Sequence, residues 1–188
     1  MNTMTTVFVA GSMNIKHLDQ EFIDRLATIV SSSFHVVVGD ADGADKSIQQ
    51  ALLELKTDRV VVYCSGLRPR NNVGNWTVHN VLPDAPEGTR AYFTAKDIEM
   101  AKTADYGLMM WDTRSTGTLS NVIELLRRGK KSVVFVNKHR EFITVSTPKG
   151  LNDLVDTMSE GARAKADSKI GLTSTLERFA RQQFSFPI

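Results

Sequence analysis

Residues 109–121 read MMWDTRSTGTLSN, and the change of pattern inside this stretch decides the fold. An apolar run at 106–111 stops at an acid, Asp112, and a small polar loop with one glycine, Gly117, follows. Apolar residues then recur at helical spacing over 119–126, so a strand, a tight loop and a helix are predicted in that order. Free backbone N–H groups and the positive end of the helix dipole meet at such a loop, which favours binding of a phosphate or another anion.

Strands and helices alternate through most of the chain. Buried strands are predicted at residues 6–10, 35–38, 59–63, 106–111 and 131–136. Continuous apolar strands joined by helices predict a parallel sheet covered on both faces. We therefore expect an α/β fold, a Rossmann-like three-layer domain with a mostly parallel sheet, over residues 1–137. A helical C-terminal appendage over residues 138–188 is expected to pack on this domain or on a partner subunit.

Composition sets broad limits. The 188 residues are 41% hydrophobic, which is enough for a real core, and 23 basic against 21 acidic side chains give no nucleic-acid signal from net charge. The single cysteine, Cys64, cannot form an intramolecular disulfide, so a cytoplasmic location is expected. No apolar run approaches the ~20 residues of a membrane span, and no signal peptide is evident, so no membrane association is predicted.

Other segments are less regular. Residues 65–88 are rich in Gly, Pro and Asn, and a binding loop and a surface excursion explain them equally well. A short strand is predicted at 90–93, followed by a helix with Thr94 as its N-cap. A further strand at 142–145, a helix with apolar residues over 151–158, a polar stretch at 159–168 and a last helix follow. The apolar face of that helix and the tail at 184–188 suggest a homo-oligomer, although intramolecular packing explains both equally well.

Three loops are predicted to converge at one edge of the sheet, because the carboxyl ends of parallel strands meet there. The first is Gly11-Ser12, the second spans 39–45 and the third spans 112–118. Glycines permit close backbone approach, and the acids of the second loop suit ribose hydroxyls, a metal or a helix cap. Four scattered histidines lack ligand spacing, so no metal site is predicted, and no P-loop or dinucleotide fingerprint is present.

The chain resembles a known group of proteins. Residues 39–45 followed by a helix resemble the GGAxGAD motif of the YspA-like (DUF2493) branch of the SLOG superfamily, whose Rossmann-like members relate to the LOG phosphoribohydrolases and to the DprA core. The opening strand with its loop, Arg70-Asn71, residues 96–105 and the S-x-GT loop at 115–118 match further family motifs in order. The resemblance covers residues 7–136.

This resemblance implies binding of a nucleotide or nucleotide-derived ligand by the strand-end loops. The implied ligand-binding residues are Gly11, Ser12, Gly39, Asp40, Asp42, Gly43, Asp45, Arg70, Asp112, Ser115, Thr116, Gly117, Thr118 and Asn121. The enzymatic LOG branch carries a glutamate three positions after the threonine of its loop, where this chain has Asn121. An amide cannot act as a general base, so a SLOG-type sensor or binding module without a cofactor is favoured, and enzymatic activity is left undecided.

Two other hypotheses remain. The chain is an N-glycosidic hydrolase or transferase, phosphoribohydrolase-like or deoxyribosyltransferase-like, if Asp112 or Glu124 acts catalytically. Glu124 is also explained as an exposed salt-bridging residue. DNA binding by analogy with DprA is the third hypothesis, and the balanced charge and lack of a basic run make a nucleic-acid partner unlikely. A local basic patch is conceivable from Arg68, Arg70, Arg127, Arg128, Lys130 and Lys131.

Overall fold

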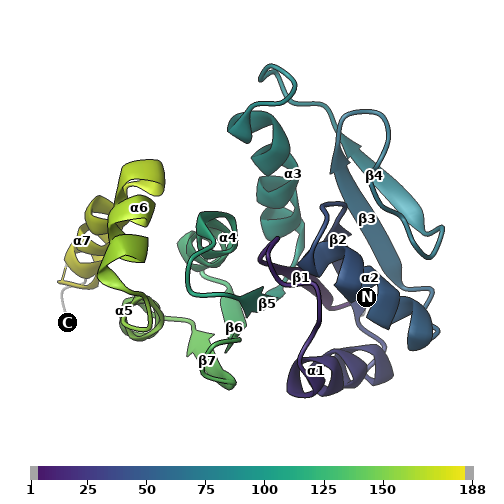
Figure 1. Ribbon diagram of the computed structural model, residues 1–188, viewed down its shortest axis with the longest axis horizontal. Helices are drawn as coiled ribbons and strands as arrows, with labels where there is room; N and C mark the ends of the chain where they lie inside the picture. The colour runs from purple at the N-terminus through teal and green to yellow at the C-terminus, as the bar shows by residue number, and fades with distance from the viewer. Residues whose placement is uncertain (1–3, 185–188) are drawn as a thin grey trace.

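The computed structural model describes residues 4–184 and is built around one seven-stranded sheet (Figure 1). Its strands are β1 Thr6–Gly11, β2 His35–Gly39, β3 Val60–Ser65, β4 Thr77–Val81, β5 Tyr106–Trp111, β6 Lys131–Val136 and β7 Glu141–Val145. They lie in the order β4-β3-β2-β1-β5-β6-β7. All neighbouring pairs are parallel except β6 and β7, which are antiparallel. The predicted α/β fold with a mostly parallel sheet is confirmed.

Helices cover both faces of the sheet. They are α1 Gln20–Ser31, α2 Ala44–Glu54, α3 Arg90–Thr103, α4 Thr116–Arg127, α5 Pro148–Val155, α6 Glu160–Ile170 and α7 Leu172–Phe184. Side chains alternate along β1, so Val7 and Val9 join the core beneath α1 and α2, while Phe8 and Ala10 join the core beneath α3 to α7. The result is three layers, with the sheet in the middle.

The strand order reverses at β1. The chain runs from β1 outward to β4 on one side and then returns to place β5 on the other side of β1. The loops after β1 and β5 therefore leave the same edge next to each other, and the N–H of Ser12 donates to the carbonyl of Met110 at 2.9 Å. This is the position where open α/β sheets form a ligand crevice.

Three local predictions are wrong. The stretch at 65–88, expected to be irregular, contains the edge strand β4, whose exposed and half-buried side chains give no run of buried apolar residues. Residues 90–93 are the first turn of α3 rather than a strand, because the Thr89 side chain, not Thr94, accepts the N–H of Tyr92 and starts the helix one turn earlier. The polar stretch at 159–168 is mostly helix α6, capped by Ser159. Its apolar face is a narrow stripe of small buried alanines at 162 and 166, which gives a weak sequence signal.

The C-terminal helices share the core of one sheet face. Leu151 and Leu154 of α5 and Phe179 of α7 belong to the same buried cluster as the residues of α4. The apolar tail at 185–188 lies outside the described residues, and the domain boundary at residue 137 stays a prediction. Among residues 4–184 no helix combines the length and the hydropathy needed to cross a bilayer.

Gly43 gives a test of the turn before α2. Its φ is +78°, and a Cβ there would overlap the backbone carbonyl of Met13. We expect Gly43→Ala to lower the free energy of unfolding by at least about 2 kcal/mol, measured by urea denaturation. Gly88→Ala is the matched control, because Gly88 has a φ of +84° but open space around it, and should cost about 1 kcal/mol. Equal losses for the two variants would contradict the close approach to Met13.

Candidate functional site

The loop between β5 and α4 is held by Asp112. Its Oδ1 atom accepts hydrogen bonds from the N–H groups of Arg114 and Ser115, at 2.9 and 2.7 Å, and from the Ser12 hydroxyl at 3.1 Å. Ser115 in turn caps α4, since its Oγ accepts the N–H of Thr118 at 3.3 Å. The carboxylate that the sequence suggested as a general base therefore shapes the loop.

The first turn of α4 presents unused donors. Within residues 4–184 the backbone N–H groups of Thr116 and Gly117 have no hydrogen-bond acceptor. A Cβ on Gly117 would have only the Ser115 hydroxyl nearby, at 3.8 Å, so the approach to this turn is open. The Arg90 guanidinium reaches across from α3 and donates to the Thr116 hydroxyl at 3.2 Å. Donors and positive charge thus meet at one helix terminus, which favours an anion.

The acids of the loop after β2 bind this chain's own residues. Asp40 is 2% exposed and accepts from the Arg70 guanidinium at 2.8 and 3.2 Å and from the Arg70 backbone N–H at 3.0 Å. Burial alone would raise the pKa of Asp40, but these bonds outweigh burial and hold the pKa below its ordinary value. Asn71 donates to Asp42 at 3.0 Å. These contacts anchor the long β3–β4 connection to the edge of the sheet.

A buried lysine lies beside this loop. Lys96 of α3 is 4% exposed, and its Nζ lies 2.7 Å from Asp97 and 4.0 Å from Asp45. Burial alone would lower the pKa of Lys96, but the two carboxylates raise it, so the ammonium stays charged. Burial raises the pKa of Asp45 to about 6, against the opposing effect of Lys96. A side chain on Gly39 would occupy this space, because its Cβ would lie 2.7 Å from the Lys96 Nζ.

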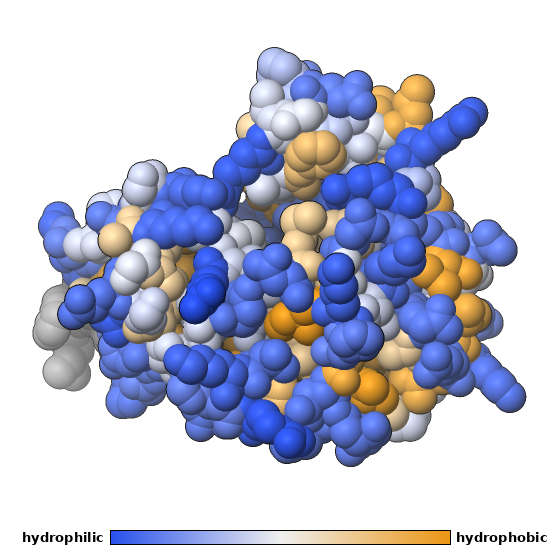
Figure 2. All heavy atoms as spheres, viewed as in Figure 1, coloured by the Kyte–Doolittle hydropathy of each residue, from blue (hydrophilic) through white to orange (hydrophobic). Residues whose placement is uncertain are grey.

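A cavity of about 620 Å³ opens at this edge, between α3, the first turn of α4 and α6. Figure 2 shows a hollow there, rimmed mainly by hydrophilic side chains. Its cationic lining residues are Arg70, Arg90, Lys96, Arg114, Lys165 and Lys169. The acids in the lining are Asp45 and Asp97. Phe93 is 37% exposed at the same cavity, and the Arg70 guanidinium lies 4.9 Å from its ring centroid.

The structure brings many of the predicted site residues to this cavity. Those that line it are Gly11, Asp45, Arg70, Ser115, Thr116, Gly117, Thr118 and Asn121. Ser12 and Asp112 support the lining from beneath, and Asp40 and Asp42 hold the adjoining loop. Glu124 is not part of this lining and pairs with Arg127 and Arg128. In residues 4–184 no group of three His, Cys, Asp or Glu side chains could hold a metal ion.

Several lining residues were missed from the sequence. The burial of Lys96 could have been predicted, because it lies four residues before the apolar Met100 and so on the same, buried face of α3. Lys165 and Lys169 were missed because α6 was not recognised as a helix. Arg90 and Phe93 were assigned to a strand, so their position at a helix N-terminus next to the cavity was not anticipated.

Comparison with solved structures identifies the fold type. The structure of DNA processing protein A from Helicobacter pylori, described as having a unique single-stranded DNA binding mode, is similar over 89% of this chain and 80% of that chain, with 16% identity and a TM-score of 0.58. The fold is similar to that of DprA. DprA from Streptococcus pneumoniae matches 81% of this chain and 55% of its own, with 17% identity and a TM-score of 0.54. No family model and no curated protein sequence matches the chain.

These neighbours correct two predictions. A small-molecule nucleotide ligand was expected and a nucleic-acid partner was considered unlikely, but the Helicobacter pylori protein binds single-stranded DNA, and both expectations are wrong. The physical reason lies in the charge distribution, because a net charge of +2 conceals the cations gathered around one cavity. The N-glycosidic alternative gains no support, since Asp112 is occupied in its loop and Glu124 is in ion pairs outside the cavity.

Asp45 gives a test of the electrostatics. Its pKa is raised in the folded protein, so folding favours the protonated form, and stability relative to Asp45→Asn should increase as the pH falls from about 6 towards 4. We expect the side-chain carboxyl carbon of Asp45 to titrate near pH 6 in an NMR experiment. An ordinary midpoint near 4 would show that the carboxylate is not buried beside Lys96.

Proposed function

We propose that this chain binds single-stranded DNA in the cavity at the carboxyl edge of its sheet. The observation that carries the proposal is the gathering of phosphate-binding and base-stacking groups around one hollow. Cations and open N–H groups line it together with an exposed phenylalanine, Phe93. Proteins that bind single strands without strong sequence preference combine such a positive groove with aromatic side chains. The DNA ligand of the similar Helicobacter pylori protein supports the same reading.

The phosphate-binding side would use α4 and α6. The open N–H groups of Thr116 and Gly117 suit one phosphate, with Arg90 and Arg114 beside them. Lys165 and Lys169 lie four residues apart on α6, so both project from the same face towards the cavity. Both lysines are exposed and have no acidic partner among residues 4–184 at ion-pair distance, which leaves their charge for a backbone phosphate.

The base-binding side would use Phe93. Its ring already carries the Arg70 guanidinium at 4.9 Å, and Arg70 is fixed by Asp40. A base can stack on this platform, and stacking of this kind is worth roughly 1–3 kcal/mol per base. Stacking on Phe93 requires an unpaired base, so the site favours a single strand over a duplex.

The proposal also covers the family branch of the chain, its division into domains, the roles of the site residues and its location. The order of motifs supports placing the chain in the YspA-like branch of the SLOG superfamily. The proposed division into a Rossmann-like domain at 1–137 and a helical appendage at 138–188 would let both parts contribute to the site, since α6 adds two lysines to the cavity. The predicted ligand-binding residues divide into those that would contact DNA and those, such as Ser12, Asp40 and Asp112, that would position them. A cytoplasmic location suits a single cysteine, Cys64.

Fluorescence anisotropy with a labelled oligothymidylate tests this function. If about four phosphates are contacted, the slope of log K against log[salt] should be about −3. Lys165→Ala/Lys169→Ala should make that slope shallower by about 1.4, because two phosphate contacts are lost. Phe93→Ala should weaken binding about 5- to 100-fold with little change of slope, since it removes stacking and no charge.

A charge-matched double variant controls for net charge. Lys131→Ala/Lys149→Ala also removes two positive charges, but Lys131 starts β6 at the opposite edge of the sheet and Lys149 lies on α5. This control should bind like the unaltered protein. Absence of binding at low salt, or equal effects of the two double variants, would refute DNA binding in this cavity.

A further inference from the structure

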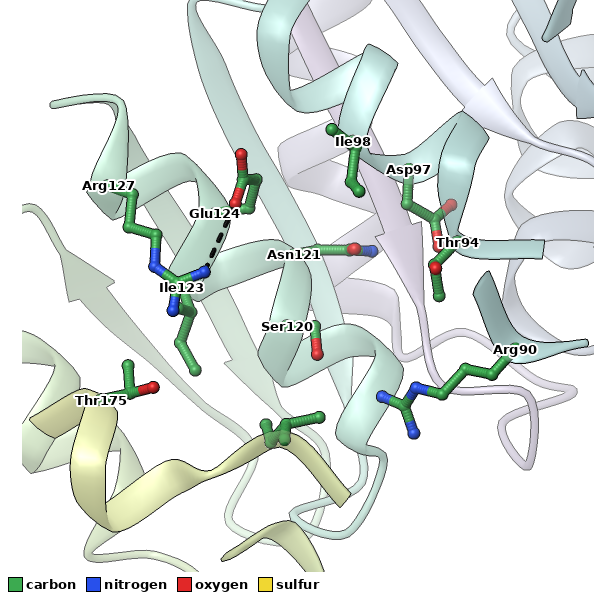
Figure 3. A pocket seen from close by; sticks show the side chains of 11 residues that line it. Arg90, Thr94, Asp97, Ile98, Ser120, Asn121, Ile123, Glu124, Arg127 and Thr175 are labelled. Carbon is green, nitrogen blue, oxygen red and sulfur yellow. Dashed lines mark ion pairs between the residues drawn. The ribbon is translucent and has the colours of Figure 1, made fainter. Parts of the chain in front are cut away.

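A second, smaller cavity of about 220 Å³ adjoins the first, between α3, α4 and the start of α7 (Figure 3). The two cavities share Arg90, Thr94, Asp97 and Asn121 in their linings, so they are continuous along the gap between α3 and α4. Pockets for drug-sized ligands occupy roughly 300–1,000 Å³, so the smaller cavity suits a single flat ring system rather than a whole nucleotide.

Asn121 is the unexplained group in this cavity. Its side chain is buried, with the residue 8% exposed, and points from α4 towards Thr94 and Asp97 in Figure 3. The side-chain amide of Asn121 makes no hydrogen bond to any residue among 4–184. By contrast Gln49, the other buried amide, donates to the carbonyls of Gly39 and Asn71 and accepts from the N–H of Val73. The fully buried side-chain atoms without a partner in residues 4–184 are the hydroxyls of Ser65 and Ser132, so the Asn121 amide opens onto the cavity instead. An amide at a cavity wall that no residue of the protein bonds is available to a ligand, with donors and an acceptor.

The walls of the smaller cavity suit the two faces of a planar ring. Its apolar lining residues are Ile98, Ile123 and Ile170. Hydrogen-bonding groups other than Asn121 come from Thr94, Asp97 and Ser120, and the first two also line the larger cavity. The ion pair of Glu124 and Arg127, at 3.7 Å, lies at the other end. An unstacked base between apolar walls, read on its edge by polar groups, is how proteins recognise an extruded base.

We infer, on the basis of the proposed DNA binding, that the smaller cavity is a base-reading subsite in which Asn121 selects adenine. An asparagine amide pairs with the N6 amino group and N7 of adenine through two hydrogen bonds, one donated and one accepted. The carboxylate of Asp97, beside Asn121, offers a further acceptor for the N6 amino group of adenine. Thymine has no such amino group. Gly117, in the first turn of α4, lies four residues before Asn121, which is about 6 Å along the helix axis. The phosphate site and the base site are therefore adjacent.

Three labelled strands of equal length test this inference by fluorescence anisotropy at one salt concentration. The first is an oligothymidylate, and the others replace every third thymine with adenine or with cytosine. The adenine-containing strand should bind at least about five-fold more tightly than the oligothymidylate, the low end expected for a two-bond contact. Asn121→Leu should abolish this preference, so that the adenine-containing strand binds no more tightly than the oligothymidylate, and the salt slope should not change because no charge is removed.

Two controls separate recognition from folding. Asn121→Leu replaces an amide that makes no hydrogen bond to residues 4–184 with an apolar group of similar size, so the melting temperature without DNA should be unchanged or higher. Asn152→Leu, an exposed position on α5, should keep the adenine preference. Equal binding of the three strands, an equal gain for cytosine, or a preference that survives Asn121→Leu would overturn the inference. Failure of every strand to bind would instead overturn the proposed DNA binding.

Discussion

A pair of hydrogen bonds between Ser12 and Asp112 holds the site together. The Ser12 hydroxyl donates to the Asp112 carboxylate and accepts the Asp112 backbone N–H, both at 3.1 Å, at the place where the strand order reverses. This bond pair joins the loops after β1 and β5, and the same carboxylate then orders the turn that begins α4. Thr113, which is β-branched, is held there at a φ of +65°, a strained conformation that such positions tolerate only when the surroundings fix them.

The electrostatics of the edge follow from where its charges are paired. Acids at the base of the site are matched to buried or half-buried cations, as in Asp40 with Arg70 and Asp45 with Lys96. The cations farther out, on α3, the α4 loop and α6, extend into the cavity. A chain of nearly balanced composition therefore presents a local positive surface, and a field of this kind depends on the arrangement of charges rather than on their sum.

The sequence predicted the sheet well because its strands are short, apolar and followed directly by polar loops, a pattern that local periodicity captures. The Asp112 loop and the residues after β2 were therefore found. The cationic walls were not, since they depend on packing: α6 brings Lys165 and Lys169 to an edge built some fifty residues earlier in the chain. Asn121 was singled out by its departure from a hydrolase motif, but only the structure shows that its amide lies at a cavity wall without a bond to the protein.

The proposed function requires that the carboxyl edge of the sheet, and no other face, receives a single strand of DNA. Amide NMR shifts of the ¹⁵N-labelled protein, followed during titration with a short unlabelled oligothymidylate, test this most directly. The largest shifts should fall at the start of α3, around the first turn of α4 and on α6. Shifts confined to α1 and the later turns of α2, or no shifts at saturating DNA, would rule out binding at this edge.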